Sequence, residues 1–403
     1  MLQFEVNTFI KKYITRRPDS MFLADIDANK ETLSQAIHGK KLLIIGGAGT
    51  IGSSFIKAII RFKPASLIVV DYNENGLTEL TRDLRSSYNE FVPAEYITYP
   101  FDFGGPIFAK LLKDHQFDLI ACFAAHKHVR SEKDHLAIEA MVKNNVFNTK
   151  NLIELAMANK PNHFFCVSTD KAANPVNVMG ASKKVMERVL LSYSNDLKIT
   201  TARFANVAFS NGSLLFGFLE RIMKRQPLSA PLDIKRYFVS PEESGQLCML
   251  ACVLGQSSDI FFPKLDASQM MSFSKIAEHF LEEMGLVAEH CKTPEEARQK
   301  AKAWQTGTKE YPVYFFASDT SGEKPYEEFF TNTDEVDMTT FRALGVVKNA
   351  EILPKENIDK MIHRFDSLFA SNKIDKKDVV DLLNNILPDF SHIETGKGLD
   401  EKM

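Results

Sequence analysis

The chain has 403 residues, of which 44% are hydrophobic and 25% charged, and its formal net charge is −3. This composition is typical of a globular protein long enough for two packed subdomains, and it argues against nucleic acid as the main partner, because phosphate binding needs a basic face. No uninterrupted apolar run reaches the roughly 20 residues of a membrane span. The N-terminus lacks the apolar core of a signal peptide, so we expect a cytoplasmic protein.

Residues 1–38 are predicted to form an N-terminal helical leader. Apolar side chains recur at helical spacing, at Val6, Phe9, Ile10, Tyr13 and Ile14. Positive charge comes from Lys11, Lys12, Arg16 and Arg17. Such a helix can lie on an anionic membrane surface or dock on its own protein or a partner subunit. We favour docking, because amphipathic helices usually bury their apolar stripe against protein.

From Lys41 onward, short apolar segments alternate with amphipathic ones. The apolar segments are rich in β-branched and aromatic residues and read KLLIIGG, SLIVVD, EYITYPFD, FDLIACFAA, NHFFCVST and ITTARFANV. Continuous apolar strands joined by helices predict a parallel sheet covered on both faces. We therefore predict an α/β fold, with a Rossmann-type, doubly wound parallel sheet over residues 39–209.

The pattern weakens beyond about Ser210, where proline, aromatic and charged residues mix. We predict a smaller C-terminal substrate-binding lobe over residues 210–345, partly interleaved with the Rossmann-type domain. The segment KTPEEARQKAKAWQTGT within it predicts a solvated helix. Residues 346–403 are predicted to form a C-terminal helical extension, in which one helix face carries Val379, Leu382, Leu383 and Ile386.

The five cysteines are an odd, dispersed set, which is typical of reduced thiols in a cytosolic core. Cys248 and Cys252 are four residues apart and share a helix face. Without a second pair of ligands, we interpret them as small buried hydrophobic residues and predict no metal site.

A glycine-rich turn follows the first predicted strand. Gly46, Gly49 and Gly52 have the three-residue spacing that permits a tight turn, close approach to a pyrophosphate and close helix packing. Thr50 and Ile51 lie between the last two glycines, where the helix N-terminus offers free N–H groups to phosphates. The glycines alone fit an ordinary turn equally well.

Acidic residues at the ends of the next two strands favour a dinucleotide. Asp71 ends the second strand, where a carboxylate can bind the adenosine ribose hydroxyls and repel the extra phosphate of NADP. The sequence therefore predicts NAD as the cofactor. Asp102, after the third strand, can accept a hydrogen bond from the adenine amino group or cap a helix.

Seven segments resemble one enzyme family in their order and spacing: GGAGTIG, AAHKHV, NNVFNT, STDKAANPVNVMGASK, RFANV, KRYF and SGEKPYEE. They are similar to nucleotide-sugar 4,6-dehydratases of the extended short-chain dehydrogenase class, in the branch that makes UDP-4-keto-6-deoxy-N-acetylhexosamines for bacterial surface glycans. The resemblance spans roughly residues 40–330. It implies an NAD-dependent lyase acting on UDP-N-acetylglucosamine or a similar nucleotide sugar, and we also expect a homo-oligomer.

The implied reaction moves hydride from sugar C4 to NAD, removes the C5 proton and the C6 hydroxyl as water, and returns hydride to C6. It needs a base at C5, an acid at the C6 hydroxyl and a group for the C4 hydroxyl proton. Short-chain dehydrogenases use tyrosine for the last task, four residues before a lysine. Here Met179 occupies that position and Lys183 is kept. A thioether can neither donate nor accept this proton.

The resemblance assigns Asp170 as the acid at C6 and Lys171 as the base at C5, with Thr169 bonding the C4 oxygen and Lys183 the nicotinamide ribose. Asp170 is the first candidate to accept the C4 proton. A base must be neutral, so we predict that burial or Lys183 lowers the pKa of Lys171. In isolation, STDK also fits a helix cap followed by a solvated lysine, Met179 fits core packing, and Lys183 fits a helix surface.

The resemblance also indicates how the substrate binds. Small residues after the fourth strand, Ala124 and Ala125, let the backbone approach NAD. The implied substrate-binding residues are Lys127, His128, Asn206, Ser213, Arg236, Glu323 and Lys324. Arg236 suits bidentate phosphate recognition or a surface ion pair, and the cations of AAHKHV also fit a solvated loop.

Two other functions stay open. A 4-epimerase shares the oxidation at C4 but returns hydride there and needs no acid at C6, so Asp170 and Lys171 beside Met179 disfavour it. A non-catalytic NAD- or nucleotide-sugar-binding protein is disfavoured because Asp170, Lys171 and Lys183 are all present.

Overall fold

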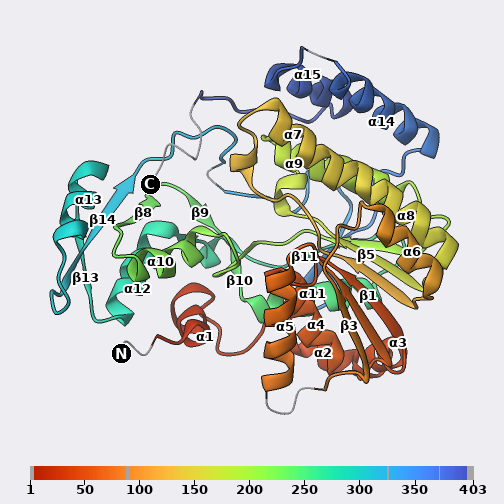
Figure 1. Ribbon diagram of the computed structural model, residues 1–403, viewed down its shortest axis with the longest axis horizontal. Coiled ribbons are helices and arrows are strands. Elements are labelled where there is room, and N and C mark those ends of the chain that lie inside the picture. Colours follow the sequence, from red (N-terminus) through yellow and green to blue (C-terminus); the bar gives the residue numbers. More distant parts are fainter. Residues whose placement is uncertain (1–3, 88–90, 325, 372, 397–403) are drawn as a thin grey trace.

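The computed structural model describes residues 4–87, 91–324, 326–371 and 373–396. At its centre is a large, mostly parallel sheet with helices on both faces (Figure 1). Within the described residues its strand order is β15-β16-β11-β6-β5-β4-β1-β2-β3. The strands are β1 Lys41–Ile45, β2 Ser66–Val70, β3 Glu95–Tyr99, β4 Leu119–Cys122, β5 His163–Val167, β6 Ile199–Ala202, β11 Ile260–Pro263, β15 Val336–Asp337 and β16 Leu344–Val347.

Adjacent strands from β3 to β11 are parallel, whereas β16 runs antiparallel to β11 and β15 antiparallel to β16. The predicted doubly wound α/β fold is confirmed. β2 and β4 are buried along their whole length, because helices cover both faces of their apolar runs. The last predicted strand is shorter than expected, since β6 ends at Ala202 and Asn206–Val207 forms β7, which pairs separately with β10 Phe238–Val239.

One face of the sheet is covered by helices from the first part of the chain and by one later helix. These are α2 Leu23–Ala28, α3 Lys30–Ile37, α4 Thr50–Ile60, α5 Glu74–Ser86 and α11 Pro241–Leu254. Helix α11 passes close to α4 because Gly245 has no side chain, and a Cβ there would overlap the Ser54 carbonyl group. Cys248 and Cys252 are buried free thiols in this layer, as predicted.

The opposite face is covered by two layers of helices (Figure 1). The inner helices are α6 Pro106–Asp114, α7 His135–Val142, α8 Asn148–Asn159 and α9 Val178–Leu191. The C-terminal helices α14 Lys355–Phe369 and α15 Lys376–Ile386 pack outside them. The predicted apolar face of the last helix is confirmed, with Val379, Leu383 and Ile386 buried and Leu382 partly buried.

A smaller lobe has its own apolar cluster and a parallel sheet of order β13-β14-β8. Its elements are α10 Leu214–Met223, β8 Leu228–Pro231, α12 Phe273–Glu283, β13 Val287–His290, α13 Pro294–Ala303 and β14 Glu310–Phe316, with the short pair β9 Lys235–Arg236 and β12 Met271–Ser272. Helix α13 is the predicted charged helix, although Ala297 and Ala301 are buried. Strands β11 and β15 lie in the main sheet although they come from the range predicted for this lobe.

The N-terminal residues divide between the two parts of the molecule. Helix α1 Val6–Phe9 and the π-helical turn Ile10–Ile14 pack into the smaller lobe, with Phe9, Ile10 and Ile14 buried there. Residues of α2 and α3 pack on the main sheet. The apolar stripe therefore docks on its own protein, as we favoured, because the lobe offers it an apolar surface. Residues 1–3 and 397–403 of the predicted terminal segments lie outside the described residues.

Among the helices of the described residues, none is both long enough and apolar enough to cross a membrane.

Candidate active site

The glycine turn after β1 requires its first and last glycines. Gly46 has a φ of +74°, and a Cβ there would lie 2.5 Å from the Ala124 backbone nitrogen. A Cβ at Gly52 would overlap the Gly46 carbonyl oxygen. Gly49 is the N-cap of α4, and a Cβ there would make only ordinary contact. The turn thus brings the N-terminus of α4 against the carboxyl ends of β1 and β4.

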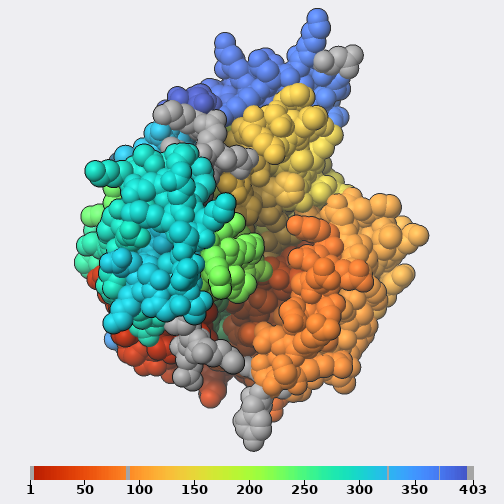
Figure 2. Space-filling view, turned by 60° about the vertical axis from the view of Figure 1, so that its left-hand side comes forward, coloured from red at the N-terminus to blue at the C-terminus, as the bar shows by residue number. Residues whose placement is uncertain are grey.

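A cavity of about 510 Å³ opens beside this turn. Figure 2 shows a hollow between the orange part of the Rossmann-type domain and the green and cyan smaller lobe. The predicted cofactor residues that line the cavity are Gly46, Gly49, Thr50, Ile51, Gly52, Asp71, Asp102, Ala124 and Ala125. The predicted substrate residue Lys127 also lines it. Lys183 is absent from the lining, as are Thr169, Asp170, Lys171 and Met179.

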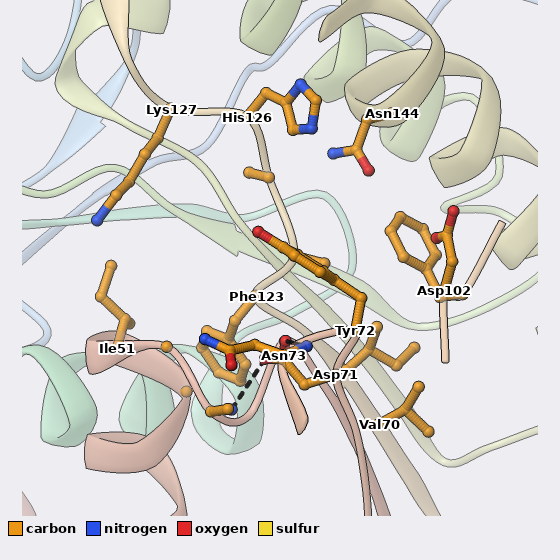
Figure 3. A pocket seen from close by; sticks show the side chains of 18 of the residues that line it. Ile51, Val70, Asp71, Tyr72, Asn73, Asp102, Phe123, His126, Lys127 and Asn144 are labelled. Atoms are coloured by element: carbon orange, nitrogen blue, oxygen red, sulfur yellow. Dashed lines mark hydrogen bonds between the residues drawn. The ribbon is translucent and has the colours of Figure 1, made fainter. Parts of the chain in front are cut away.

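The end of β2 forms one wall of the cavity. The buried Asp71 carboxylate accepts hydrogen bonds from the backbone N–H groups of Ala48 and Asn73, both at 3.0 Å, so it also orders the glycine turn. Tyr72 is 81% exposed, and its ring extends toward the middle of the cavity, facing His126 and Lys127 (Figure 3). Aromatic and acidic groups at this wall fit the base and ribose of a nucleotide.

Asp102 does not cap a helix, and its predicted contact with adenine stays a prediction. It lines the cavity, and its carboxylate accepts a hydrogen bond from the Gly104 N–H at 2.9 Å in the turn before α6. The N-cap of α6 is Gly105 rather than Asp102. The exposed carboxylate therefore orders a loop while facing the cavity (Figure 3).

A loop of the smaller lobe reaches the glycine turn. The Lys127 ammonium donates to the Asn211 carbonyl oxygen at 3.2 Å, and the Asn211 N–H donates to the Thr50 hydroxyl at 2.9 Å. His128 lies against Gly212, where a Cβ would come 3.1 Å from its ring. Burial and nearby cations lower the pKa of His128.

Thr169, Asp170 and Lys171 form a compact group after β5. The Thr169 hydroxyl donates to the Asp170 carboxylate at 2.8 Å, and the Lys171 ammonium donates to the same oxygen at 3.1 Å. Asp170 is only 4% exposed and the Lys171 side chain 18% exposed. The alternative interpretation of STDK as a helix cap followed by a solvated lysine is therefore wrong, because Asp170 is buried and Lys171 is largely buried.

The protonation of Lys171 differs from our expectation. Burial disfavours its charge, but the carboxylates of Asp170 and Glu327 outweigh burial and raise the pKa of Lys171. Glu327 is 5% exposed, and its carboxylate lies 3.5 Å from the Lys171 ammonium. The predicted lowering of the Lys171 pKa is wrong for this state of the protein, because two acidic neighbours surround the amine.

Arg236 connects this group to the predicted substrate residues. Its guanidinium lies 3.6 Å from the Glu323 carboxylate and 3.8 Å from that of Glu327, and it donates to the Lys324 carbonyl oxygen at 2.9 Å. Arg236 is buried, so the surface ion pair considered above is wrong. Lys171, Arg236, Glu323 and Glu327 thus form one continuous charged cluster.

Met179 is the second residue of helix α9, whose first turn packs closely against the Lys171 backbone. A Cβ at Gly180 would lie 2.5 Å from the Lys171 carbonyl oxygen, so the glycine lets α9 approach the catalytic candidates. Met179 is buried, and its N–H donates to the Glu132 carboxylate at 2.8 Å. The imidazole of His392, in the C-terminal extension, lies 3.8 Å from the Glu132 carboxylate.

Lys183 is a buried residue of the same helix. Its ammonium donates to the Val167 carbonyl oxygen at 2.7 Å, at the end of β5, and burial lowers its pKa. The helix-surface position considered for it is wrong. Its predicted contact with the nicotinamide ribose stays a prediction.

Two predicted substrate residues have local structural contacts. Ser213 is the N-cap of α10, where its hydroxyl accepts a hydrogen bond from the Phe216 N–H at 3.2 Å. Asn206 is half-buried in β7, and its N–H donates to the Tyr237 carbonyl oxygen at 3.1 Å. Their roles toward a substrate stay predictions.

The sequence interpretation missed three residues near these candidates: the buried Glu132 and Glu327 and the partly buried His392. Glu327 is part of the segment SGEKPYEE, so its motif was visible although its contact with Lys171 was not. Glu132 lies in the stretch RSEKDHLAIEA, and His392 lies in the C-terminal extension.

Residues 42–349 match the family described as polysaccharide biosynthesis protein. An uncharacterised membrane protein of Methanocaldococcus jannaschii is 32% identical over 84% of this chain and 99% of its own length. The polysaccharide biosynthesis protein EpsC of Bacillus subtilis is 28% identical over 82% of this chain, and the match spans only 49% of EpsC.

Two relatives with named activities match a shorter part of the chain. The inverting UDP-N-acetylglucosamine 4,6-dehydratase of Campylobacter jejuni is 24% identical, and a UDP-glucose 4-epimerase of Rickettsia canadensis is 28% identical, each over 59% of this chain and about 70% of its own length.

Solved structures share the fold at low identity. Pen from Bacillus thuringiensis aligns with a TM-score of 0.63 and 22% identity over 82% of this chain and 98% of its own. A UDP-glucose 4-epimerase from Thermotoga maritima aligns with a TM-score of 0.52 and 17% identity over 72% and 90%. The chain has the extended short-chain dehydrogenase fold and belongs to the polysaccharide biosynthesis protein family, whose relatives include nucleotide-sugar dehydratases and epimerases.

Proposed function

We propose that this protein is an NAD-dependent nucleotide-sugar 4,6-dehydratase that acts on UDP-N-acetylglucosamine or a similar UDP-N-acetylhexosamine. The observation that carries the proposal is the buried pair of Asp170 and Lys171, 3.1 Å apart, at the carboxyl edge of the sheet where ligands bind in such folds. An acid and a base at one point suit elimination of water. A cytoplasmic homo-oligomer stays part of the proposal.

The residues of the glycine turn fit NAD. A side chain at Gly46 or Gly52 would overlap the backbone of the turn or of the β4 end, so these glycines allow the turn that brings the N–H groups of the α4 N-terminus to the cavity. Asp71 lines the same cavity, and we propose that it binds a ribose. NAD, when bound, would take hydride from C4 and deliver it to C6. We propose that Lys183 holds the nicotinamide ribose and that Lys127, His128, Asn206, Ser213, Arg236, Glu323 and Lys324 hold the nucleotide sugar.

The proposed proton transfers balance over one cycle that starts with Asp170 ionised and Lys171 neutral. Asp170 takes the C4 hydroxyl proton while Thr169 bonds the C4 oxygen. Lys171 then takes the C5 proton, which the C4 ketone has made acidic, and Asp170 gives its proton to the C6 hydroxyl, which leaves as water. Lys171 finally returns its proton to C5, so both side chains regain their starting states.

The direct test is to incubate the protein with UDP-N-acetylglucosamine and NAD and follow the nucleotide sugar by mass spectrometry. We expect a product lighter by one water, with no NADH accumulating, because hydride returns within each turnover. A product of unchanged mass but altered configuration at C4 would establish the epimerase instead. Sustained formation of NADH in step with product would contradict the dehydratase, and binding without any conversion would establish a non-catalytic protein.

Met179 is expected to be an apolar spacer. Met179→Leu keeps the volume of this buried side chain, so most of kcat should remain. Met179→Tyr should not raise kcat, because a phenol would crowd a site that already has Asp170 for the C4 proton. Steady-state rates of both variants, with thermal unfolding as a check on folding, measure this. A gain in rate with tyrosine would mean that the C4 proton lacks an efficient acceptor.

A further inference from the structure

The base proposed above lies against carboxylates that raise its pKa, and one of them, Glu327, is a residue that the sequence interpretation did not identify. Lys171 lies between two buried carboxylates, Asp170 at 3.1 Å and Glu327 at 3.5 Å. Asp170 accepts and then donates a proton in the proposed cycle, whereas Glu327 has no step in it. Glu327 therefore needs a separate explanation.

Burying a carboxylate is costly unless cations or hydrogen bonds compensate. Burial and the nearby Asp170 carboxylate raise the pKa of Glu327, and Lys171, Arg236 and Lys324 oppose that rise. The nearest of these cations are Lys171 at 3.5 Å and Arg236 at 3.8 Å. Glu327 thus lies between Lys171, the proposed base, and Arg236, the residue proposed to bind the phosphates of the substrate.

We propose that Glu327 is a positioning residue, which holds the Lys171 amine beside Asp170 and sets the pH above which that amine becomes the base. This inference rests on the proposed function for the role of Lys171. The charged groups facing Lys171 come from three segments: Asp170 on its own turn, Glu327 on the 321–328 segment, and Arg236 on β9. Asp170 and Glu327 favour the protonated amine, and Arg236 opposes it.

The sign of the expected effect follows from Coulomb attraction. A carboxylate beside an amine favours the protonated amine, so removing the charge in Glu327→Gln should lower the pKa of Lys171. Because the proposed cycle starts from neutral Lys171, kcat rises with pH as Lys171 loses its proton, and this rise should move to lower pH in the variant. The plateau of kcat should fall about tenfold, since the amine is less well held, while KM changes less than about twofold.

Two measurements test the inference. The first is NMR titration of ¹³Cε-labelled lysine in the protein without substrate, with the Lys171 signal assigned by its absence in Lys171→Ala. The second is the pH profile of kcat. Glu327→Asp withdraws the carboxylate by one methylene group. The NMR titration of Lys171 and the pH profile of kcat should therefore both move to lower pH, by less than in Glu327→Gln. If the glutamine variant does not fold, the aspartate variant provides the test.

Glu323→Gln is the matched control. The Glu323 carboxylate lies 3.6 Å from the Arg236 guanidinium and that of Glu327 3.8 Å, but Glu323 is not among the carboxylates that act on Lys171. Its variant should alter KM and leave the Lys171 titration in place. If the glutamine and aspartate variants of Glu327 both leave that titration unmoved, the inference is overturned. The NMR result does not depend on turnover, so failure of the wild-type protein to dehydrate any nucleotide sugar would overturn the proposed function alone.

Discussion

Lys171→Ala is expected to lower kcat for dehydration at least ~100-fold, the low end for loss of a general base. The amine is the proposed acceptor of the C5 proton, and in the structure it is buried against Asp170, where bulk water is a poor substitute. Reactions run in heavy water give a direct readout. The wild-type protein should incorporate deuterium at C5, and the variant should lose this incorporation together with turnover.

Asp170→Asn should lower kcat by a similar factor, because the amide cannot donate a proton as an acid does.

Lys348→Ala is a suitable control for the lysine variant. Lys348 also pairs with a buried carboxylate, with its ammonium 2.9 Å from Asp259, but it directly follows β16 at the edge of the sheet rather than lying among the site residues. Its loss should lower stability and leave kcat close to that of the wild type. If Lys171→Ala still dehydrates at a near-normal rate, the base lies elsewhere and the assignment is wrong.

Gly46→Ala is expected to weaken NAD binding about 10- to 100-fold, measured by isothermal titration calorimetry. The added methyl group would lie 2.5 Å from the Ala124 nitrogen at a φ of +74°, so the turn or the strand end must shift. Overpacking of this kind costs about 1–3 kcal/mol, and each 1.4 kcal/mol is a factor of ten in affinity. The shift would fall on the proposed pyrophosphate site.

Gly39→Ala separates backbone strain from steric overlap. Gly39 has nearly the same conformation, with a φ of +69°, but a Cβ there has nothing within 4 Å. This variant should lose about 1–2 kcal/mol of stability from the left-handed conformation while keeping its NAD affinity. Unchanged affinity in Gly46→Ala would show that the dinucleotide does not bind at this turn.

The sheet could be predicted because its signals are local. Apolar runs such as the one before Asp71 end where β2 ends, and the glycine spacing after β1 specifies a turn whose geometry depends on neighbouring residues. The end of the sixth predicted strand could not be placed in this way. β6 stops at Ala202 and β7 begins at Asn206 because the chain leaves the sheet to pair with β10, a contact with a distant segment.

The candidate site shows the same division. The segment STDK and the spacing from Met179 to Lys183 are visible along the chain, so the choice of catalytic candidates needed no structure. The pKa shift of Lys171 was predicted in the wrong direction, because it depends on the carboxylates of Asp170 and Glu327 together, and Glu327 lies far along the chain. The burial of Arg236 likewise depends on residues of the 321–328 segment that pack against it.

By itself, then, the sequence determined the parallel α/β architecture, the glycine turn and the group of residues around Asp170, because strand periodicity, turn chemistry and consecutive motifs are properties of short stretches. Only the tertiary structure decided where the N-terminal apolar stripe docks, that Glu132 contacts both Met179 and His392, and that Glu327 favours the charged form of Lys171. These features are contacts between distant segments, and the electrostatics of a buried group depend on every charge folded against it.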